Sequence, residues 1–151
     1  MVDRESMKRI ISIITIVLTM AGILSCAKPD ADYVHDDATI SAIYICTTQK
    51  DSDGKEKSLK FAGKINQDEG TIMFTIPKAN RKGIDLEAVK LRANVGFDAY
   101  VKVIKEGGKE VDRTLYGIHD ITEGIDLTVT AKMTGRTKDY HLTAKYEKNN
   151  P

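Results

Sequence analysis

The thiol of Cys26 is the side chain whose position points most directly to chemistry. It follows a basic start at Met7–Arg9 and an apolar run from Ile10 to Leu24. A basic segment, an apolar segment and a small residue before a cleavage point form the pattern of a secretory signal peptide. We therefore predict that residues 1–25 are a signal peptide. Met7 is a better start for it than Met1, because the residues between them include two carboxylates.

The segment Ile23–Cys26 resembles the lipobox of bacterial lipoproteins. In that family the chain is cleaved before the cysteine, the thiol is lipidated and the new amino terminus is acylated. The resemblance implies a covalent lipid on Cys26, such as one containing palmitate, and attachment to the outer membrane through it. A signal anchor and a buried core helix are the alternatives for the apolar run. The run has fifteen residues, whereas a bilayer span takes about 20.

If Cys26 carries lipid, the second cysteine, Cys46, has no disulfide partner. Cys46 ends an apolar run that begins at Ile43, and we predict a small buried hydrophobe there rather than a reactive thiol.

The chain contains neither a nucleophile elbow nor a phosphate loop, and most of its carboxylates fall in turns. We therefore predict a non-enzymatic protein with no catalytic residue and no cofactor other than the lipid.

The remaining candidates for metal ligands do not share a ligand spacing. The three histidines, His35, His119 and His141, are expected in a tether, in a loop and on the outward face of the last strand. None of them forms a His-x-x-x-His pair. Residues 51–54, Asp-Ser-Asp-Gly, begin like a calcium loop, but its twelfth position is Ala62 instead of Glu. We predict a tight turn at residues 51–54 and no metal site.

Charge and length limit the function classes further. The chain has 151 residues, of which 23 are basic and 22 are acidic. Residues 1–25 hold three of the basic and two of the acidic residues, so the remainder is neutral. A neutral surface with interspersed charges gives no electrostatic reason to expect nucleic acid or acidic lipid as a partner. Residues 26–151 are long enough for one domain with a hydrophobic core.

Residues 26–38 contain four aspartates and one proline and are predicted to form a tether. This acidic stretch resembles the export signal of some Bacteroidetes surface lipoproteins, and a plain solvated linker is the alternative.

From Thr39 to residue 148 the chain alternates apolar and polar residues, as in Ile72–Ile76, with turn signals between the runs. This pattern predicts an all-β, antiparallel sandwich of seven or eight strands. The predicted strands are residues 39–47, 57–65, 70–77, 87–96, 98–105, 110–116, 126–133 and 138–147.

The order of these strands resembles the Ig-like β-sandwich domains of Bacteroidetes surface lipoproteins, a domain type of unknown function. The resemblance is carried by the Gly-x-Ile-x-Phe-x-Ile-Pro strand at Gly70–Pro77 and by the last hairpin, Val129–Ala144. That hairpin holds Gly135, Thr137, Lys138 and Tyr140. Relatives act as glycan-binding or spacer modules in nutrient capture, so the resemblance implies a non-enzymatic function. The resemblance does not identify ligand-binding residues in this chain, because the positions that match are ones that shape the fold.

Exposed tyrosines are the candidate contacts for a sugar, since aromatic faces stack on pyranose rings. Tyr44, Tyr100 and Tyr116 are candidates, and Tyr100 and Tyr116 are the predicted ligand-binding residues, together with the loop from Asp51 to Lys57. The expected function is that of an outer-membrane lipoprotein whose Ig-like domain binds a glycan or another envelope protein. The alternative is a structural spacer or subunit of an envelope complex, without a ligand of its own.

Overall fold

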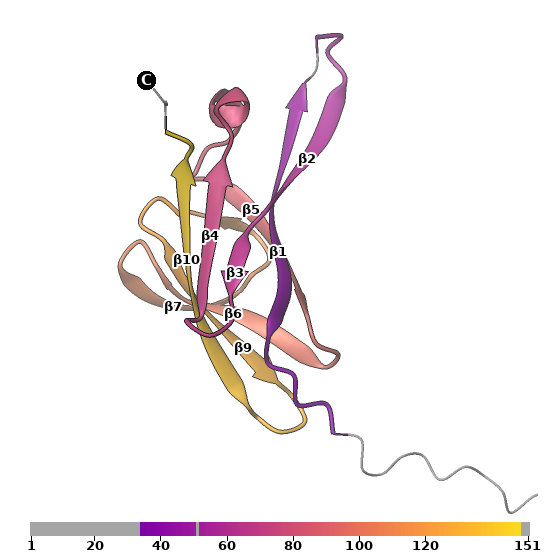
Figure 1. The fold of residues 1–151 in the computed structure, drawn as a ribbon, viewed down its shortest axis with the longest axis vertical. Helices are drawn as coiled ribbons and strands as arrows, with labels where there is room; N and C mark the ends of the chain where they lie inside the picture. Colours follow the sequence, from indigo (N-terminus) through magenta and orange to yellow (C-terminus); the bar gives the residue numbers. More distant parts are fainter. Residues whose placement is uncertain (1–33, 51, 149–151) are drawn as a thin grey trace, which may run out of the picture. The chain divides into compact units, whose positions relative to one another are not determined.

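The computed structural model describes residues 34–50 and 52–148, which form two packed β-sheets (Figure 1). The predicted signal peptide, Cys26 and the first part of the tether lie outside these residues. No helix among the described residues has the length and apolar character needed to cross a bilayer. The elements in chain order are β1 (Ile40–Lys50), β2 (Glu56–Ala62), β3 (Lys64–Asn66), β4 (Thr71–Ile76), the 3-10 helix η1 (Lys78–Gly83), β5 (Val89–Val95), β6 (Ala99–Glu106), β7 (Lys109–Thr114), β8 (Ile118–His119), β9 (Ile125–Ala131) and β10 (Thr137–Tyr146).

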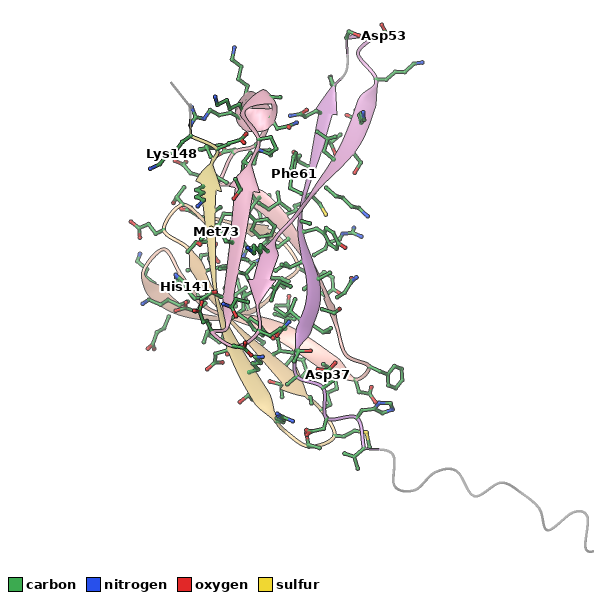
Figure 2. The ribbon with its side chains drawn as sticks, viewed as in Figure 1. Asp37, Asp53, Phe61, Met73, His141 and Lys148 are labelled. Atoms are coloured by element: carbon green, nitrogen blue, oxygen red, sulfur yellow. The ribbon has the colours of Figure 1, made fainter. Side chains whose placement is uncertain are left out.

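One sheet has four strands in the order β2-β1-β5-β8, and all of its pairs are antiparallel. The other has six strands in the order β3-β4-β10-β9-β6-β7. In this second sheet β4 and β10 are parallel, and the remaining pairs are antiparallel. The β1–β2 hairpin continues beyond the core and ends near Asp53 (Figure 2).

The core lies between the sheets and is filled by the apolar residues of each alternating run. In β9 and β10, Val129, Ala131, Tyr140 and Leu142 are at most 2% exposed, whereas His141 points to solvent. The predicted register of this hairpin is therefore confirmed. Tyr140 is satisfied in the core because its hydroxyl donates to Gln67 Oε1 at 2.7 Å and accepts the N–H of Ile40 at 3.1 Å.

The predicted fold class, an all-β sandwich, is confirmed, but the described residues contain ten strands instead of seven or eight. The segment predicted as one strand over residues 57–65 is divided at Gly63 into β2 and β3, which belong to different sheets. A Cβ at Gly63 would lie 3.0 Å from side-chain atoms of both Ile43 and Phe74. Glycine therefore lets the backbone pass close to the core while the chain changes sheets.

The end of the predicted tether packs against the domain. Ala38 is 3% exposed, and Asp36 forms an ion pair with Arg136 at 3.0 Å. The hydrogen bonds from Thr134 and Arg136 lower the pKa of Asp36. Asp37 accepts hydrogen bonds from both the N–H and the hydroxyl of Thr39. The predicted domain boundary is Thr39, but the packed part of the chain begins a few residues before it.

Candidate functional site

The two tyrosines predicted to bind ligand lie beyond the same end of the β6–β7 ladder. Tyr100 and Tyr116 are each two residues past its last pair, Lys102 and Thr114. Tyr100 is 38% exposed on the outer face of the six-stranded sheet, and Tyr116 is 90% exposed in the segment that crosses to β8. No ring contact joins the two tyrosines in the described part of the chain. Each tyrosine therefore offers its own aromatic contact to a ligand.

The loop from Asp51 to Lys57 is predicted to share a site with Tyr100, but its described residues, 52–57, lie at the other end of β1, and the last two belong to β2. Ile40 begins β1 and pairs with Val95 near the end of β5, so the turn that leads to Tyr100 lies beside the start of β1. The loop follows the end of the same eleven-residue strand, where Asp53 marks the hairpin tip (Figure 2). Because a strand rises about 3.3 Å per residue, the two places are roughly 30 Å apart. The prediction of one combined site is therefore wrong.

The three histidines occupy separate environments. The ring of His35 lies 4.8 Å from that of Phe97, and His141 Nδ1 lies 2.5 Å from a carboxylate oxygen of Asp126. His119 is fully buried, although the sequence places it in a loop. Within the described residues, no group of three His, Cys, Asp or Glu side chains is arranged to hold a metal ion.

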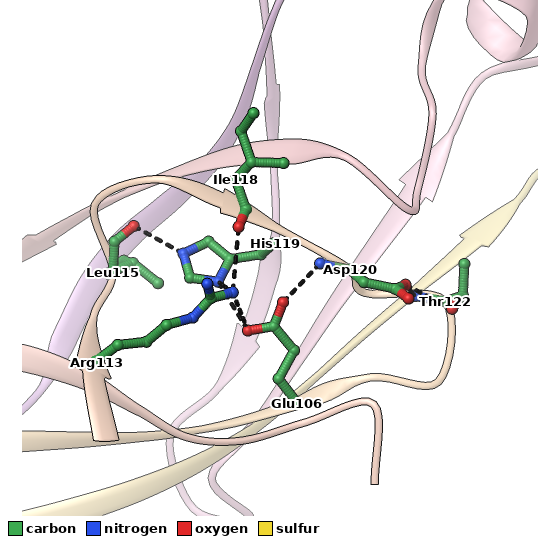
Figure 3. Close-up of polar contacts among 7 residues, drawn as sticks. All are labelled: Glu106, Arg113, Leu115, Ile118, His119, Asp120 and Thr122. Atoms are coloured by element: carbon green, nitrogen blue, oxygen red, sulfur yellow. Dashed lines mark hydrogen bonds and ion pairs between the residues drawn. The ribbon is translucent and has the colours of Figure 1, made fainter. Parts of the chain in front are cut away.

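His119 belongs to a polar network that links the two sheets at one edge (Figure 3). It lies on β8 of the four-stranded sheet, while Glu106 on β6 and Arg113 on β7 belong to the six-stranded sheet. One oxygen of Glu106 accepts the N–H of Asp120 at 2.8 Å, and the other forms an ion pair with Arg113 and lies 3.2 Å from His119 Nδ1. The guanidinium of Arg113 also donates to the carbonyl of Ile118 at 3.1 Å.

The carbonyl of Leu115 lies 3.1 Å from His119 Nε2. A carbonyl oxygen only accepts, so Nε2 carries the proton that is donated. Nδ1 lies 2.9 Å from the Arg113 guanidinium and 3.2 Å from the Glu106 carboxylate. Every side-chain polar atom of His119 thus has a partner, as a fully buried imidazole requires.

The environment of Glu106 shifts its pKa in two directions. Burial alone would raise the pKa, because the charged form loses solvation. Hydrogen bonds from the N–H of Asp120, from His119 and from Arg113 outweigh burial and hold the pKa of Glu106 below its ordinary value. The carboxylate is therefore ionised at neutral pH and serves the network as a fixed acceptor. We assign this network a structural role.

Cys46 differs from its prediction as a buried hydrophobe. Ile43 and Ile45 point into the core, so the alternation of β1 places Cys46 on the outer face of the four-stranded sheet. It is half-buried and forms no disulfide with a described residue. Its cross-strand partners are Lys60 on β2 and Lys90 on β5. The thiol therefore lies between two cationic side chains on an exposed sheet face.

This outer face is the candidate functional site that the sequence analysis missed. We define the basic face as Lys60, Lys90 and Arg92, together with the half-buried Tyr44 and Cys46 between them. Tyr44 pairs with Arg92 across β1 and β5, as Cys46 pairs with Lys90. The three cations are exposed, and none of them forms an ion pair with a described residue. The charges of residues 26–151 balance, but they are not evenly spread over the surface.

A shallow depression of about 440 Å³ indents this face beside η1. Its polar lining comes from neighbouring strands and from the loop after η1 and includes Cys46, Thr48, Ser58, Asp85, Lys90 and Arg92. Asp85 is the one carboxylate in that lining, and it accepts the N–H of Glu87 at 3.0 Å. The depression thus offers hydroxyl groups and positive charge side by side, on rigid strands.

Comparison with known proteins adds information on the fold. No protein-family model matches the chain, and no curated protein matches it. Among solved structures, it is similar to a protein of Bacteroides fragilis that is provisionally described as a secreted protein. The two share 20% sequence identity with a TM-score of 0.51, over 77% of this chain and 100% of the other. This likeness supports the fold described above.

Proposed function

We propose that the protein is a non-enzymatic lipoprotein of the outer membrane whose Ig-like sandwich binds a glycan. The observation that carries this proposal is the open basic face, where Tyr44 lies between strands that also present hydroxyl and cationic groups. Sugar recognition uses aromatic surface for stacking and polar groups for the hydroxyls of the sugar. Sheet strands hold such groups in fixed positions, which lowers the entropy lost on binding.

The shape of the face favours binding over turnover. Hydrolysis of a glycosidic bond uses two carboxyl groups on either side of the sugar. The depression is shallow and its lining holds one carboxylate, Asp85. The pattern of residues 1–26 supports export and a lipid anchor. Many anchored copies at a membrane would compensate for weak individual sites through avidity.

A glycan array with the detergent-extracted full chain, followed by titration, tests the proposal. The chain lacks Trp, so we expect dissociation constants on the order of micromolar to millimolar, or about −8 to −4 kcal/mol. Tyr44→Ala should weaken binding if the sugar stacks on the basic face. Tyr100→Ala and Tyr116→Ala test the two contacts predicted from the sequence.

The outcomes separate the candidate functions. Loss of binding in the Tyr100 or Tyr116 variant alone would place the glycan at the end of the β6–β7 ladder. A wild-type chain that binds nothing on a broad array would contradict the proposal. Co-purification with a larger envelope protein would then favour the alternative function, a structural subunit or spacer.

A further inference from the structure

We propose that the glycan is acidic and that Lys60, Lys90 and Arg92 bind its carboxylate or sulfate groups. This inference rests on the proposed glycan-binding function and names the class of glycan. It starts from the distribution of charge over the two sheets. The strands of the four-stranded sheet carry five basic residues and one acidic residue, Glu56. The strands of the six-stranded sheet carry seven basic and five acidic residues.

The register gathers the three cations on one side of the sheet. Lys60 and Lys90 both pair with Cys46, one from each neighbouring strand. Adjacent strands lie about 4.8 Å apart, so the stems of the two lysines are roughly 10 Å apart across the sheet. Arg92 lies two residues beyond Lys90 on the same face, roughly 7 Å along the strand. The three charges therefore surround the Cys46 position within the reach of one or two acidic sugar units.

The protein does not neutralise these charges. On the six-stranded sheet, Lys102 forms an ion pair with Asp112 at 2.7 Å, and Arg113 forms one with Glu106. No described carboxylate lies within ion-pair distance of Lys60, Lys90 or Arg92. Like charges grouped without a counter-charge repel one another. A bound anion would remove the repulsion, so the arrangement is complementary to a polyanion.

The depression favours an acidic glycan over an anionic membrane as the occupant. A membrane surface is broad and would meet the cations without filling a concave site. A sugar acid has hydroxyl groups beside its charged group. The depression presents the hydroxyls of Thr48 and Ser58 beside the charges of Lys90 and Arg92. This combination matches a polysaccharide that carries carboxylate or sulfate groups.

Titration of the full chain in detergent with polygalacturonate, chondroitin sulfate and neutral dextran tests the inference. We expect the acidic polysaccharides to bind more tightly than dextran, and their binding to weaken as salt is raised. The triple variant Lys60→Gln/Lys90→Gln/Arg92→Gln should bind about 30-fold more weakly, since each exposed charge contact contributes a factor of roughly three.

Two matched variants separate this site from general electrostatic attraction. The control is Lys64→Gln/Lys105→Gln/Lys145→Gln, which removes three exposed cations from the other sheet. It should bind the acidic polysaccharides within about threefold of the wild type. The variant Lys60→Arg/Lys90→Arg keeps both charges and should keep the affinity. Thermal unfolding of each variant shows that its fold is retained.

Three results would overturn the inference. If dextran bound as tightly as the acidic chains and the triple variant had no effect, the glycan-binding function would stand but the acidic class would be wrong. If both triple variants lost affinity equally, binding would be due to net charge. If vesicles containing phosphatidylglycerol bound through the basic face and no polysaccharide did, the partner would be a membrane surface. A wild type that bound neither polysaccharides nor array glycans would contradict the proposed function itself.

Discussion

Replacement of Glu106 by glutamine tests the polar network that joins the two sheets. The side chain of Glu106 is 12% exposed, and its carboxylate contacts the N–H of Asp120, the guanidinium of Arg113 and the ring of His119. Glu106→Gln keeps the shape and one acceptor oxygen. It removes the negative charge and points an amide N–H₂ toward groups that also donate. We therefore expect the folded state to lose stability without a change of fold.

The contacts of Glu106 set the size of the expected loss. A hydrogen bond that involves a charged group contributes about 1.5–3 kcal/mol, and a neutral one about 0.5–1.5 kcal/mol. The bond to Asp120 is weakened by roughly the difference, about 1 kcal/mol. The pair with Arg113 adds less than a buried pair would, because the arginine side chain is 44% exposed and solvent screens it. The expected total is about 1–3 kcal/mol of unfolding free energy.

Urea unfolding followed by circular dichroism at neutral pH measures this loss. The control is Glu110→Gln on β7, which removes an exposed carboxylate and should change stability by less than about 0.5 kcal/mol. The same measurement in acid adds a second test. Because folding lowers the pKa of Glu106, its stabilising effect is present above the ordinary pKa and is lost as pH falls through the lowered one. The wild type and Glu106→Gln should therefore converge in acid. A gap that is equal at about pH 7 and pH 3 would refute the reasoning.

Three further predictions concern the core and the anchor. Leu142→Ala should lower the free energy of unfolding by about 2–5 kcal/mol, because Leu142 is fully buried. Thr143→Ala should change it by less than about 0.5 kcal/mol, and equal losses in urea unfolding would mean that the faces of β10 are assigned wrongly. Tyr140→Phe should lower the free energy of unfolding by about 1–3 kcal/mol, since the N–H of Ile40 loses its partner in a buried site. No change in the same assay would show that this hydrogen bond does not stabilise the fold. Cys26→Ala should abolish labelling by a palmitate analogue and release the protein from membranes, and a wild type without label would contradict the lipid anchor.

The sequence was most informative where apolar residues alternate over six or more positions. In β4 and in the β9–β10 hairpin, the faces follow from the pattern alone, because a slip of one residue would expose the whole apolar set. The structure places Ile72, Phe74 and Leu142 in the core accordingly. The sequence does not reveal which strands pair. The parallel contact of β4 with β10 joins segments that are far apart in the chain, and alternation carries no information on partners.

Short elements were missed for a physical reason. β8 has two residues, which is too few to show a period, so the sequence predicts a loop at His119. Its burial depends on Glu106 and Arg113, which come from another sheet. Gly63 gave a local signal, a glycine within a predicted strand, but the change of sheet depends on the packing of Ile43 and Phe74. In both cases tertiary contacts decide the local structure.

The basic face shows that charge composition alone does not predict where charges gather on a folded sheet. A near-zero net charge says nothing about where the charges lie, because alternation in a strand assigns each charge to one face and pairing then sets its neighbours. β1 and β5 contain no acidic residue, so the outer face they share can only be positive or uncharged. Lys90 and Arg92 could have been assigned to that face from the sequence, because Val89 and Leu91 alternate with them. Lys60 joins them only through the pairing of β2 with β1, which the sequence does not show. A ligand that needs all three charges therefore recognises the folded sheet, so a variant that unfolds β2 from β1 should lose the acidic glycan even with every lysine in place.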